Sequence, residues 1–372
     1  MKILHCIYDH IRNPWVAGGG AVRVHEIYRR LAGRHEITVV CGAYPGSEDY
    51  TENNVHYRFE GTRRNNYILS TFCYAALAAR HIKNHAGAYD IVVEDFAPYN
   101  PVFSFIWHKD AVIQLHQREG LRHLKKYAFL GIPFFLIEKF YQRFFKNAVS
   151  ESDIGRDSYK LRGRVGVISN GFDPKLLSLE PEEDNYALFL GRLHINQKGL
   201  DTLHDAMPFF DSKLIIGGGG KDERKVQALF RDAVISGRAG FAGYVQGREK
   251  EELLRRCLFV VIPSRYEGQP VTVVESAACG KPVIVSDIPE LQYAVNEGFG
   301  LSFKAGDAMD LAEKINLLLE SPSLRKTMGM KGKDYAGNFT WDRIAEKYEQ
   351  YLLGIASLPA QKNDQRKRYR EN

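Results

Sequence analysis

The sequence is poor in features that support disulfide or metal chemistry. Its five cysteines are odd in number and form no Cys-x-x-Cys pair, and three of them lie in apolar segments. This pattern is typical of reduced, buried cysteines in a cytosolic protein rather than of a disulfide-linked secreted one. The sequence also contains no Asp-x-Asp and no His/Cys cluster with zinc spacing. We therefore expect no metal ion held by the protein.

A long hydrophobic run is missing as well. Residues 127–137 form an uncharged apolar segment of 11 residues, which is too short to span a bilayer. Met1 and Lys2 lead directly into a predicted strand, without the apolar segment and small-residue cleavage site of a signal peptide. We therefore predict a cytoplasmic protein that is neither secreted nor transmembrane.

The glycine pattern of a dinucleotide-binding site is incomplete. Gly18, Gly19 and Gly20 follow a predicted strand over residues 3–8, but Arg23 stands where the third glycine of Gly-x-Gly-x-x-Gly is needed. The next predicted strand also lacks the acid that would hold a ribose. NAD binding is therefore not expected. A glycine run before a helix still suits an anion, and a flexible turn is the alternative.

The composition is that of a soluble globular protein, but its charge is uneven. At 372 residues, with 44% hydrophobic and 26% charged residues, the chain is long enough for two domains. Residues 118–147 contain seven Lys/Arg against two Asp/Glu, interleaved with aromatic residues. An amphipathic helix over 133–145 with solvated basic residues would explain this segment; a surface that rests on anionic lipid is the alternative. The basic segment lacks a nucleic-acid-reading motif, so a nucleic acid is not an expected partner.

The most informative stretch, residues 259–286, predicts a β-loop-α-β unit. An apolar strand over 259–262 ends at Pro263, and a helix over 271–279 is stopped by Gly280 and Pro282 before the next strand. In parallel sheets ligands bind beyond the carboxyl ends of strands, where Glu267, Gly268 and Gln269 lie.

A second acid, Glu275, follows eight residues after Glu267. An isolated pair at this spacing is typical of two solvated acids. Glu275, however, is flanked by Val274 and Ala277 on an otherwise apolar helix, so we expect it to be partly buried and to need a partner.

The segment SRYEGQPVTVVESAACGKPVIVSD resembles the signature of the family 4 glycosyltransferases, which are retaining, nucleotide-sugar-dependent enzymes of the GT-B fold. The resemblance implies that Glu267 faces the donor sugar and that Glu275 hydrogen-bonds the nucleotide ribose. It also places Gly268, Gln269 and Pro270 at the donor. The family's usual aromatic-Gly pair is replaced here by Gln269 and Pro270.

Two cations and a histidine extend the resemblance. Gly-Arg-x6-Gly at residues 191–199 matches the family's phosphate-binding pair, Arg192 and Lys198, and Arg and Lys suit a diphosphate. His116, directly after a predicted strand over 111–115, matches the family's histidine that contacts the donor sugar, although Gln117 replaces the usual Asp. Without the resemblance, a histidine in this place is more often structural.

Two further segments are similar to donor-binding parts of the family. GGGAVRVHEIYRRLAGRHEITVVCG is similar to its glycine loop, which implies that Gly19 and Gly20 lie under the donor phosphates. GFAGYVQ, residues 240–246, resembles the strand and loop that meet the nucleobase, where Tyr244 lies. The similarity covers roughly residues 1–355.

The resemblance implies an α/β protein with two doubly wound Rossmann-like domains facing across a cleft. We place the acceptor-side domain at 1–172 and the nucleotide-sugar-binding domain at 173–340, with the acidic stretch 179–185 as a solvated connector. Thr340 is the candidate N-cap of a helix over 341–355 that crosses back to the first domain. Residues 356–372 are polar and basic, and we predict a disordered tail there.

The function implied is a retaining, metal-independent hexosyltransferase that uses a UDP-, GDP- or ADP-sugar and no cofactor. Its acceptor would be a glycan or lipid-linked hydroxyl in surface polysaccharide or glycolipid synthesis, and residues 118–147 would dock it peripherally on the inner face of the plasma membrane. The alternatives are a GT-B phosphorylase or epimerase and a catalytically inactive sugar-nucleotide-binding protein. The joint presence of Glu267, Arg192, Lys198 and Glu275 argues against an inactive protein.

Overall fold

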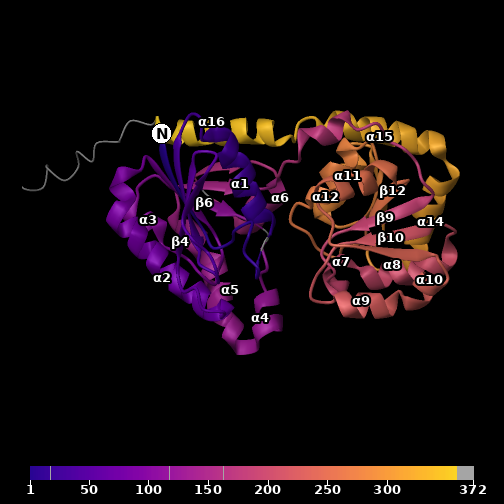
Figure 1. Ribbon diagram of the computed structural model, residues 1–372, viewed down its shortest axis with the longest axis horizontal. Helices are drawn as coiled ribbons and strands as arrows, with labels where there is room; N and C mark the ends of the chain where they lie inside the picture. Colours follow the sequence, from indigo (N-terminus) through magenta and orange to yellow (C-terminus); the bar gives the residue numbers. More distant parts are fainter. Residues whose placement is uncertain (17, 117, 162, 358–372) are drawn as a thin grey trace, which may run out of the picture.

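The structure, a computed structural model, consists of two α/β units (Figure 1) and describes residues 1–16, 18–116, 118–161 and 163–357. The long C-terminal helices run along the top of both units in the view of Figure 1. This arrangement confirms the predicted fold of two facing Rossmann-like units. Most of the predicted disordered tail, from residue 358 onward, lies outside the described residues.

The first unit contains an eight-stranded sheet in the order β3-β4-β2-β1-β5-β6-β7-β8, parallel except for the β3–β4 pair. Its strands are β1 (Lys2–Ile7), β2 (Glu36–Gly42), β3 (Tyr50–Glu52), β4 (Val55–Glu60), β5 (Ile91–Asp95), β6 (Ala111–Leu115), β7 (Asn147–Ser150) and β8 (Arg164–Val167). Its helices are α1 (Gly19–Leu31), α2 (Tyr67–His85), α3 (Ser104–Trp107), α4 (Arg122–Tyr127), α5 (Gly131–Phe140) and α6 (Asp153–Tyr159). The central strands are buried on both faces, as expected for a parallel sheet covered by helices.

Two predicted helices of this unit have different bounds in the structure. Helix α1 begins at Gly19 rather than at residue 21, so Gly19 and Gly20 form its first turn and Gly18 is the N-cap. The helix predicted over 133–145 is α5, which ends at Phe140 and continues as a 3-10 turn over Tyr141–Phe144. The sequence analysis did not predict β3, β4, β7 or α2.

The second unit contains a six-stranded parallel sheet in the order β11-β10-β9-β12-β13-β14. Its strands are β9 (Tyr186–Leu190), β10 (Lys213–Gly217), β11 (Ala239–Gly243), β12 (Phe259–Ile262), β13 (Val283–Ser286) and β14 (Gly300–Phe303). Its helices are α7 (Ile195–Lys198), α8 (Leu200–Ala206), α9 (Glu223–Leu229), α10 (Arg231–Ile235), α11 (Gly247–Arg256), α12 (Val271–Ala278), α13 (Gln292–Asn296), α14 (Ala308–Glu320) and α15 (Pro322–Ala336). The predicted β-loop-α-β unit is β12-α12-β13, with both strands as predicted and the helix one residue shorter.

The acidic connector is held by ion pairs instead of being only solvated. Within it, Glu182 pairs with Arg255, and Asp184 accepts from Arg256 at 2.8 Å. Glu183 accepts from Arg325 of α15 at 2.6 Å. These three arginines belong to the second unit, so the connector is fixed to that unit's surface.

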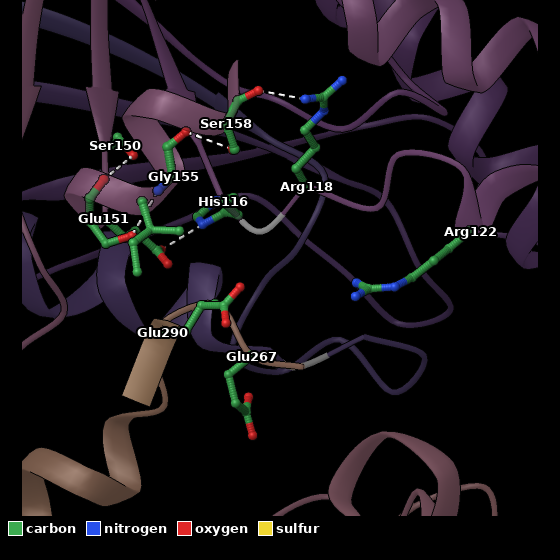
Figure 2. A pocket seen from close by; sticks show the side chains of 12 residues that line it. His116, Arg118, Arg122, Ser150, Glu151, Gly155, Ser158, Glu267 and Glu290 are labelled. Atoms are coloured by element: carbon green, nitrogen blue, oxygen red, sulfur yellow. Dashed lines mark hydrogen bonds and ion pairs between the residues drawn. The ribbon is translucent and has the colours of Figure 1, made fainter. Parts of the chain in front are cut away.

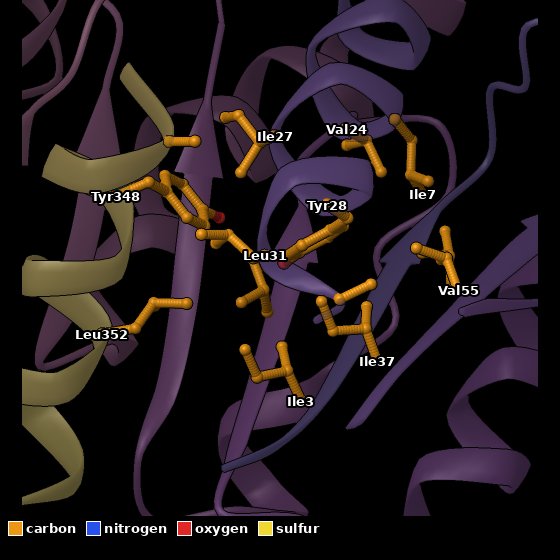
Figure 3. Packing of buried hydrophobic residues seen from close by; sticks show 14 of the residues in the cluster. Ile3, Ile7, Val24, Ile27, Tyr28, Leu31, Ile37, Val55, Tyr348 and Leu352 are labelled. Atoms are coloured by element: carbon orange, nitrogen blue, oxygen red, sulfur yellow. The ribbon is translucent and has the colours of Figure 1, made fainter. Parts of the chain in front are cut away.

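The chain crosses between the units twice, and the two crossings touch. The backbone N–H of Phe172 donates to Phe339 O at 3.1 Å, and that of Trp341 donates to Phe172 O at 3.1 Å. Helix α16 (Trp341–Ala356) then returns to the first unit, and the Thr340 hydroxyl accepts from its Arg343 N–H as the predicted N-cap. Tyr348 and Leu352 of α16 pack into the same core as Leu31 of α1 (Figure 3).

Candidate active site

Two of the pockets between the units are lined by most of the predicted site residues, and the larger of these two encloses about 570 Å³. The first unit contributes Gly19 and Val22 from α1, and the second contributes Arg192, Tyr244 and Glu275. Four of the predicted donor-binding residues, Gly19, Arg192, Tyr244 and Glu275, therefore line one pocket, although they come from four separate segments.

The glycine turn after β10 shapes the wall of this pocket. Gly217, Gly218 and Gly219 all line it. Gly218 has a φ of +135°, and a Cβ there would lie 1.8 Å from the carbonyl oxygen of Gly191. Only glycine fits this position, because any side chain would both strain the backbone and collide with the neighbouring loop. The close approach leaves backbone exposed at the pocket wall beside Arg192.

The smaller pocket, of about 100 Å³, lies between the loop after β6 and the loop after β12. It is lined by His116 and Glu151 of the first unit and by Glu267, Gly268 and Glu290 of the second (Figure 2). Two arginines, Arg118 and Arg122, complete it on the first unit. Glu267 and His116, the two residues predicted to lie at the sugar, thus line the same pocket.

Glu267 is buried and hydrogen-bonded on one oxygen. Its Oε1 accepts from Lys198 Nζ at 2.5 Å and from the Ser264 hydroxyl at 2.5 Å. Lys198, at the end of α7, therefore neutralises Glu267 in this structure, whereas Arg192 lines the larger pocket and is exposed. The two predicted phosphate-binding cations are thus 6 residues apart in sequence but have different surroundings.

Glu275 is buried on α12 and has the partner that its environment requires. Its Oε1 accepts from Lys250 Nζ of α11 at 2.5 Å. The expectation of a buried acid is confirmed, since only 8% of Glu275 is exposed. The sequence analysis missed Lys250, which lines the larger pocket with Glu275. Lys250 could have been predicted from its position near the start of α11, just after the segment with Tyr244.

His116 lies between two carboxylates of the first unit. Its Nδ1 is 2.7 Å from Glu151 Oε1, and its Nε2 is hydrogen-bonded to Asp95 Oδ1. Burial alone would lower the pKa of His116, but Asp95 and Glu151 raise that pKa well above its usual value. The imidazole is therefore a cation near neutral pH. Both of its nitrogens are already engaged, so it could donate to a sugar hydroxyl only by releasing a carboxylate.

Asp95 and Glu151 are two further residues of the site that the sequence analysis missed. Burial opposes ionisation of both, yet the charge and hydrogen bonds of His116 lower the pKa of each below its usual value. Asp95 is the last residue of β5 and Glu151 directly follows β7, so both stand at carboxyl ends of strands next to β6. Gln117, the residue after His116, lies outside the described residues.

Helix α1 begins against His116. A Cβ at Gly20 would lie 3.4 Å from His116 Nε2, so the absence of a side chain allows the helix start to approach the imidazole. The N–H of the N-cap residue Gly18 donates to Asp9 Oδ2 at 2.8 Å. Burial raises the pKa of Asp9 to about 6, against the lowering effect of the backbone hydrogen bonds from Gly18 and His10.

The loop after Glu267 also contacts the first unit. Gln269 Oε1 accepts from the backbone N–H of Asn170 at 2.6 Å, and Pro270 is the N-cap residue of α12. The Arg122 guanidinium lies 3.6 Å from the centre of the Tyr266 ring, a second contact across the cleft. Among the predicted site residues, all of them within the described part of the chain, Gly20, Lys198, Gln269 and Pro270 are absent from the linings of these two pockets.

Two features of the structure bear on metals and membranes. In the described part of the chain, no three His, Cys, Asp or Glu side chains are grouped so that they could hold a metal ion. Likewise, within residues 1–16, 18–116, 118–161 and 163–357, no helix combines the length and apolar character needed to cross a membrane.

Two protein-family models match consecutive parts of the chain. Residues 17–176 match the model described as Glycosyltransferase Family 4, and residues 177–335 match the one described as Glycosyl transferases group 1. The matches meet at residue 176, near the first crossing between the units.

Curated relatives match about half of the chain. An uncharacterized glycosyltransferase of Methanocaldococcus jannaschii is 34% identical over 56% of this chain and 62% of its own. The N,N'-diacetylbacillosaminyl-diphospho-undecaprenol alpha-1,3-N-acetylgalactosaminyltransferase of Campylobacter jejuni is 31% identical over 50% and 51%. The phosphatidyl-myo-inositol mannosyltransferase of Mycobacterium leprae is 29% identical over 55% of each chain. The aligned part thus spans between about a half and two-thirds of these relatives.

Solved structures match almost the whole chain in fold. Sucrose-phosphate synthase from Thermosynechococcus elongatus superposes with a TM-score of 0.78 at 19% identity, over 95% of this chain and 99% of that one. HepE of Anabaena in complex with UDP and glucose superposes with a TM-score of 0.73 at 18% identity, over 95% and 100%. At these identities the similarity establishes the two-unit fold.

Proposed function

Because the chain belongs to the family 4 glycosyltransferases, we propose that it transfers a glycosyl unit from a nucleoside-diphosphate sugar to a hydroxyl acceptor with retention of anomeric configuration. The observation that carries the proposal is the placement of the two acids of the Glu-x7-Glu pattern. Glu275 lines the larger pocket with Arg192, and Glu267 lines the smaller one with His116. One pocket suits a nucleotide, and the other suits the sugar and the acceptor hydroxyl.

In the proposed complex the nucleotide occupies the larger pocket. Glu275 accepts from the ribose hydroxyls, Tyr244 and its neighbours face the base, and Arg192 contacts the diphosphate. The backbone of the glycine turn and the start of α1 at Gly19 and Gly20 add N–H groups and a positive helix end, which favour an anion. Lys198 is the second diphosphate cation, and this role requires it to leave Glu267 when the donor binds.

The proposed reaction takes place on one face of the sugar. The bond between the anomeric carbon and the diphosphate oxygen breaks while the acceptor oxygen bonds to the same face of that carbon. The departing phosphate oxygen takes the proton of the acceptor hydroxyl, so no enzyme nucleophile is needed. Glu267 stabilises the positive charge that develops on the sugar, and Arg192 and Lys198 stabilise the leaving diphosphate. The His116 cation is balanced by the ionised Asp95 and Glu151, so these three groups together add no positive charge beside the developing sugar cation.

We further propose that turnover requires no divalent metal. The support for this is that the sequence has no Asp-x-Asp, while Arg192, Lys198 and the backbone amides provide positive charge for the diphosphate. Turnover in EDTA equal to that in buffer is the expected result. Loss of activity in EDTA that added Mg²⁺ or Mn²⁺ restores would contradict it.

We propose a lipid-linked acceptor at an anionic membrane. Two relatives are named for lipid substrates, one for a diphospho-undecaprenol and the other for phosphatidyl-myo-inositol. In this chain, helices α4 and α5 project at the lower end of the first unit (Figure 1). Large apolar side chains are exposed there: Leu121, Phe129, Leu130, Ile132, Leu136, Phe140 and Phe144. Lys139 and Arg143 are exposed among them, so this α4–α5 surface, residues 121–144, combines apolar and basic groups as an anionic leaflet requires.

The proposed function is tested by thermal unfolding with a panel of UDP-, GDP- and ADP-sugars. A donor that binds the folded protein raises its melting temperature by mass action. The donor found in this way is then assayed for transfer and for hydrolysis. Arg192→Ala should lower kcat/KM by a factor that corresponds to a loss of about 2–4 kcal/mol of transition-state stabilisation. Arg224→Ala, which changes an exposed arginine of α9, is the matched control. No protection by any donor, or equal turnover in both variants, would overturn the proposal.

A further inference from the structure

A chain of buried hydrogen bonds leads from His116 to helix α16. His116 Nε2 is bonded to Asp95 Oδ1, and Asp95 Oδ2 accepts from Gln114 Nε2 at 2.7 Å. Gln114 Oε1 in turn accepts from the Tyr348 hydroxyl at 3.0 Å. Two residues of the first sheet, Asp95 and Gln114, thus connect the His116 imidazole at the cleft to helix α16, which directly follows the second crossing between the units.

A second branch runs from Asp95 to the first crossing. Asp95 Oδ2 is 3.4 Å from His5 Nε2, and His5 Nδ1 is 2.8 Å from the Tyr28 hydroxyl. The Tyr28 and Tyr348 rings meet edge to face with centroids 6.2 Å apart. The Arg23 guanidinium lies 5.9 Å from the Tyr348 ring centre and donates to the carbonyl oxygens of residues 168 and 169 at 2.8 and 2.6 Å. Those carbonyls lie just before the crossing at Phe172.

This polar group is enclosed by the apolar core of the first unit. His5, Arg23, Tyr28, Gln114 and Tyr348 are each no more than 1% exposed. A buried polar side chain costs free energy unless its hydrogen bonds are made, and an apolar core of the same volume would be no less stable. These hydrogen-bonded polar side chains therefore fix the positions of the strands and helices that carry them. His116, at the smaller pocket, is the member of the network that reaches solvent.

The geometry at His116 makes its orientation depend on these partners. A neutral imidazole has one donor nitrogen, whereas both nitrogens of His116 are within hydrogen-bond distance of carboxylate oxygens. Both nitrogens therefore donate, and the ring is held as a cation between β5 and the loop after β7. A shift of Asp95 would change the orientation and the charge of the ring together.

We propose that Tyr348 and Gln114 are positioning residues, which act through Asp95 so that the placement of α16 sets the orientation of the His116 imidazole at the smaller pocket. The inference rests on the proposed function for its catalytic meaning, because His116 lies on the sugar side of that site. Domain movement at the crossings near Phe172 and Trp341 would then be transmitted to the sugar pocket through α16 and Arg23.

Five charged or titratable groups on four elements surround His116 or its partners. They are Asp95 at the end of β5, Glu151 after β7, His5 on β1, Arg23 on α1 and Asp9 after β1. Burial opposes the protonated imidazole, whereas Asp95 and Glu151 favour it. Tyr348 and Gln114 carry no charge at neutral pH. If substitution of either residue changes the titration midpoint of His116, the cause is therefore a change in the position of Asp95 or His116 and not the loss of a charge.

The test is an NMR titration of the His116 imidazole in the full-length protein without donor or acceptor, with His116→Gln used to assign the signal. Wild-type His116 should stay protonated well above the usual histidine range. In Tyr348→Phe the titration midpoint should fall by several tenths of a pH unit, because Gln114 loses a donor and Asp95 is less firmly held. Asp95→Asn, which removes the carboxylate itself, should lower the midpoint further.

Tyr351→Phe is the matched control on the same helix. The Tyr351 hydroxyl donates to the carbonyl oxygens of Ala148 and Arg164 and has no part in the chain to His116. The Tyr351→Phe variant should therefore leave the titration midpoint of His116 unchanged. Gln114→Met, which conserves volume and removes the central link, is a second variant in case Tyr348→Phe unfolds. His116 midpoints equal to wild type in both Tyr348→Phe and Gln114→Met would overturn the proposal.

The titration is independent of catalysis, so it separates the two proposals. If no donor binds but the His116 midpoint responds as expected, the positioning inference stands and the proposed function fails. If a donor is found, Tyr348→Phe should lower kcat severalfold with little change in KM for the donor. Equal losses in Tyr348→Phe and Tyr351→Phe would instead indicate a general effect on packing and would count against the positioning role.

Discussion

At the scale of single residues, the two glutamates of the cleft are each bonded to a lysine. Lys198 holds Glu267 and Lys250 holds Glu275, both at 2.5 Å. A buried carboxylate needs such a partner, and a ligand that displaces one lysine must replace its hydrogen bond. The two acids therefore have separate partners, and they line different pockets.

Substitution of these acids should separate nucleotide binding from transfer. Glu275→Gln is expected to weaken binding of the nucleoside diphosphate and of the intact donor by similar factors, because the ribose is common to both. Glu267→Gln should leave nucleoside diphosphate affinity close to wild type while transfer falls. Isothermal titration calorimetry measures both affinities, with Glu290→Gln in the smaller pocket as the control. Equal loss of nucleotide affinity in both variants would count against the assignment.

Asp9 gives a pH-dependent prediction at the same scale. Its pKa is raised by burial from 3.8 to about 6. A carboxyl group with a raised folded-state pKa adds stability when protonated below pH about 4, and that contribution is lost as pH rises through about 6. Asp9→Asn should therefore increase the free energy of unfolding at pH 7.5 relative to wild type, by about 1–2 kcal/mol after allowance for partial exposure.

The measurement is chemical denaturation of wild type and Asp9→Asn at pH 4 and pH 7.5. An asparagine oxygen can still accept from the Gly18 N–H, so the cap at the start of α1 is retained. The difference between the proteins should shrink at pH 4, where Asp9 is protonated. A difference of the same size at both pH values would show that ionisation of Asp9 does not affect stability.

At the scale of elements, the turn between β10 and α9 determines the wall of the larger pocket. Gly218→Ala should destabilise the protein by several kcal/mol and abolish donor protection, because the added Cβ would lie 1.8 Å from Gly191 O. Gly237→Ala is the control, since Gly237 also has a positive φ, +74°, but nothing lies within 4 Å of a Cβ there. That variant should lose only about 1 kcal/mol from backbone strain. Thermal and denaturant unfolding compare the two, and equal losses would contradict the steric argument.

At the scale of the whole molecule, the basic charge and the exposed apolar side chains are concentrated in the first unit. Residues 1–170 contain 23 Lys/Arg against 16 Asp/Glu. The α4–α5 surface exposes 74% of Phe129 and 63% of Leu130. Attraction to an anionic leaflet contributes roughly 1 kcal/mol for each basic residue near it, and inserted apolar side chains add to this.

Vesicle co-sedimentation tests the membrane surface. The wild type should pellet with anionic vesicles at about 50 mM salt and be released at about 500 mM, where the screening length is short. Phe129→Ser with Lys139→Glu should weaken the binding. Ile235→Ser removes an equally exposed apolar side chain, 74%, from the second unit and should have no effect. If the wild type stays in the supernatant at low salt, the membrane proposal fails and a soluble acceptor must be sought.

The sequence by itself determined the features that depend on local signals. The β12-α12-β13 unit was predicted almost to the residue, because apolar runs of strand length and the stop at Gly280 and Pro282 lie within one short segment. The same holds for α16, whose start is fixed by the Thr340 N-cap. The burial of Glu275 followed from its apolar neighbours on one helix. The end of α5 and the strands β3, β4 and β7 could not be predicted from the sequence, because packing against distant segments decides where such short elements begin and end.

Only the tertiary structure decided which charged groups meet. Asp95, His116 and Glu151 are far apart in sequence, but each stands at the carboxyl end of one of the neighbouring strands β5, β6 and β7. Strand order is set by the packing of the whole sheet, so no local pattern indicates that a histidine will be held between these two carboxylates. The pairing of Lys198 with Glu267 and of Lys250 with Glu275 has the same origin, because side chains from separate loops and helices are brought together only when the parallel strands are in register.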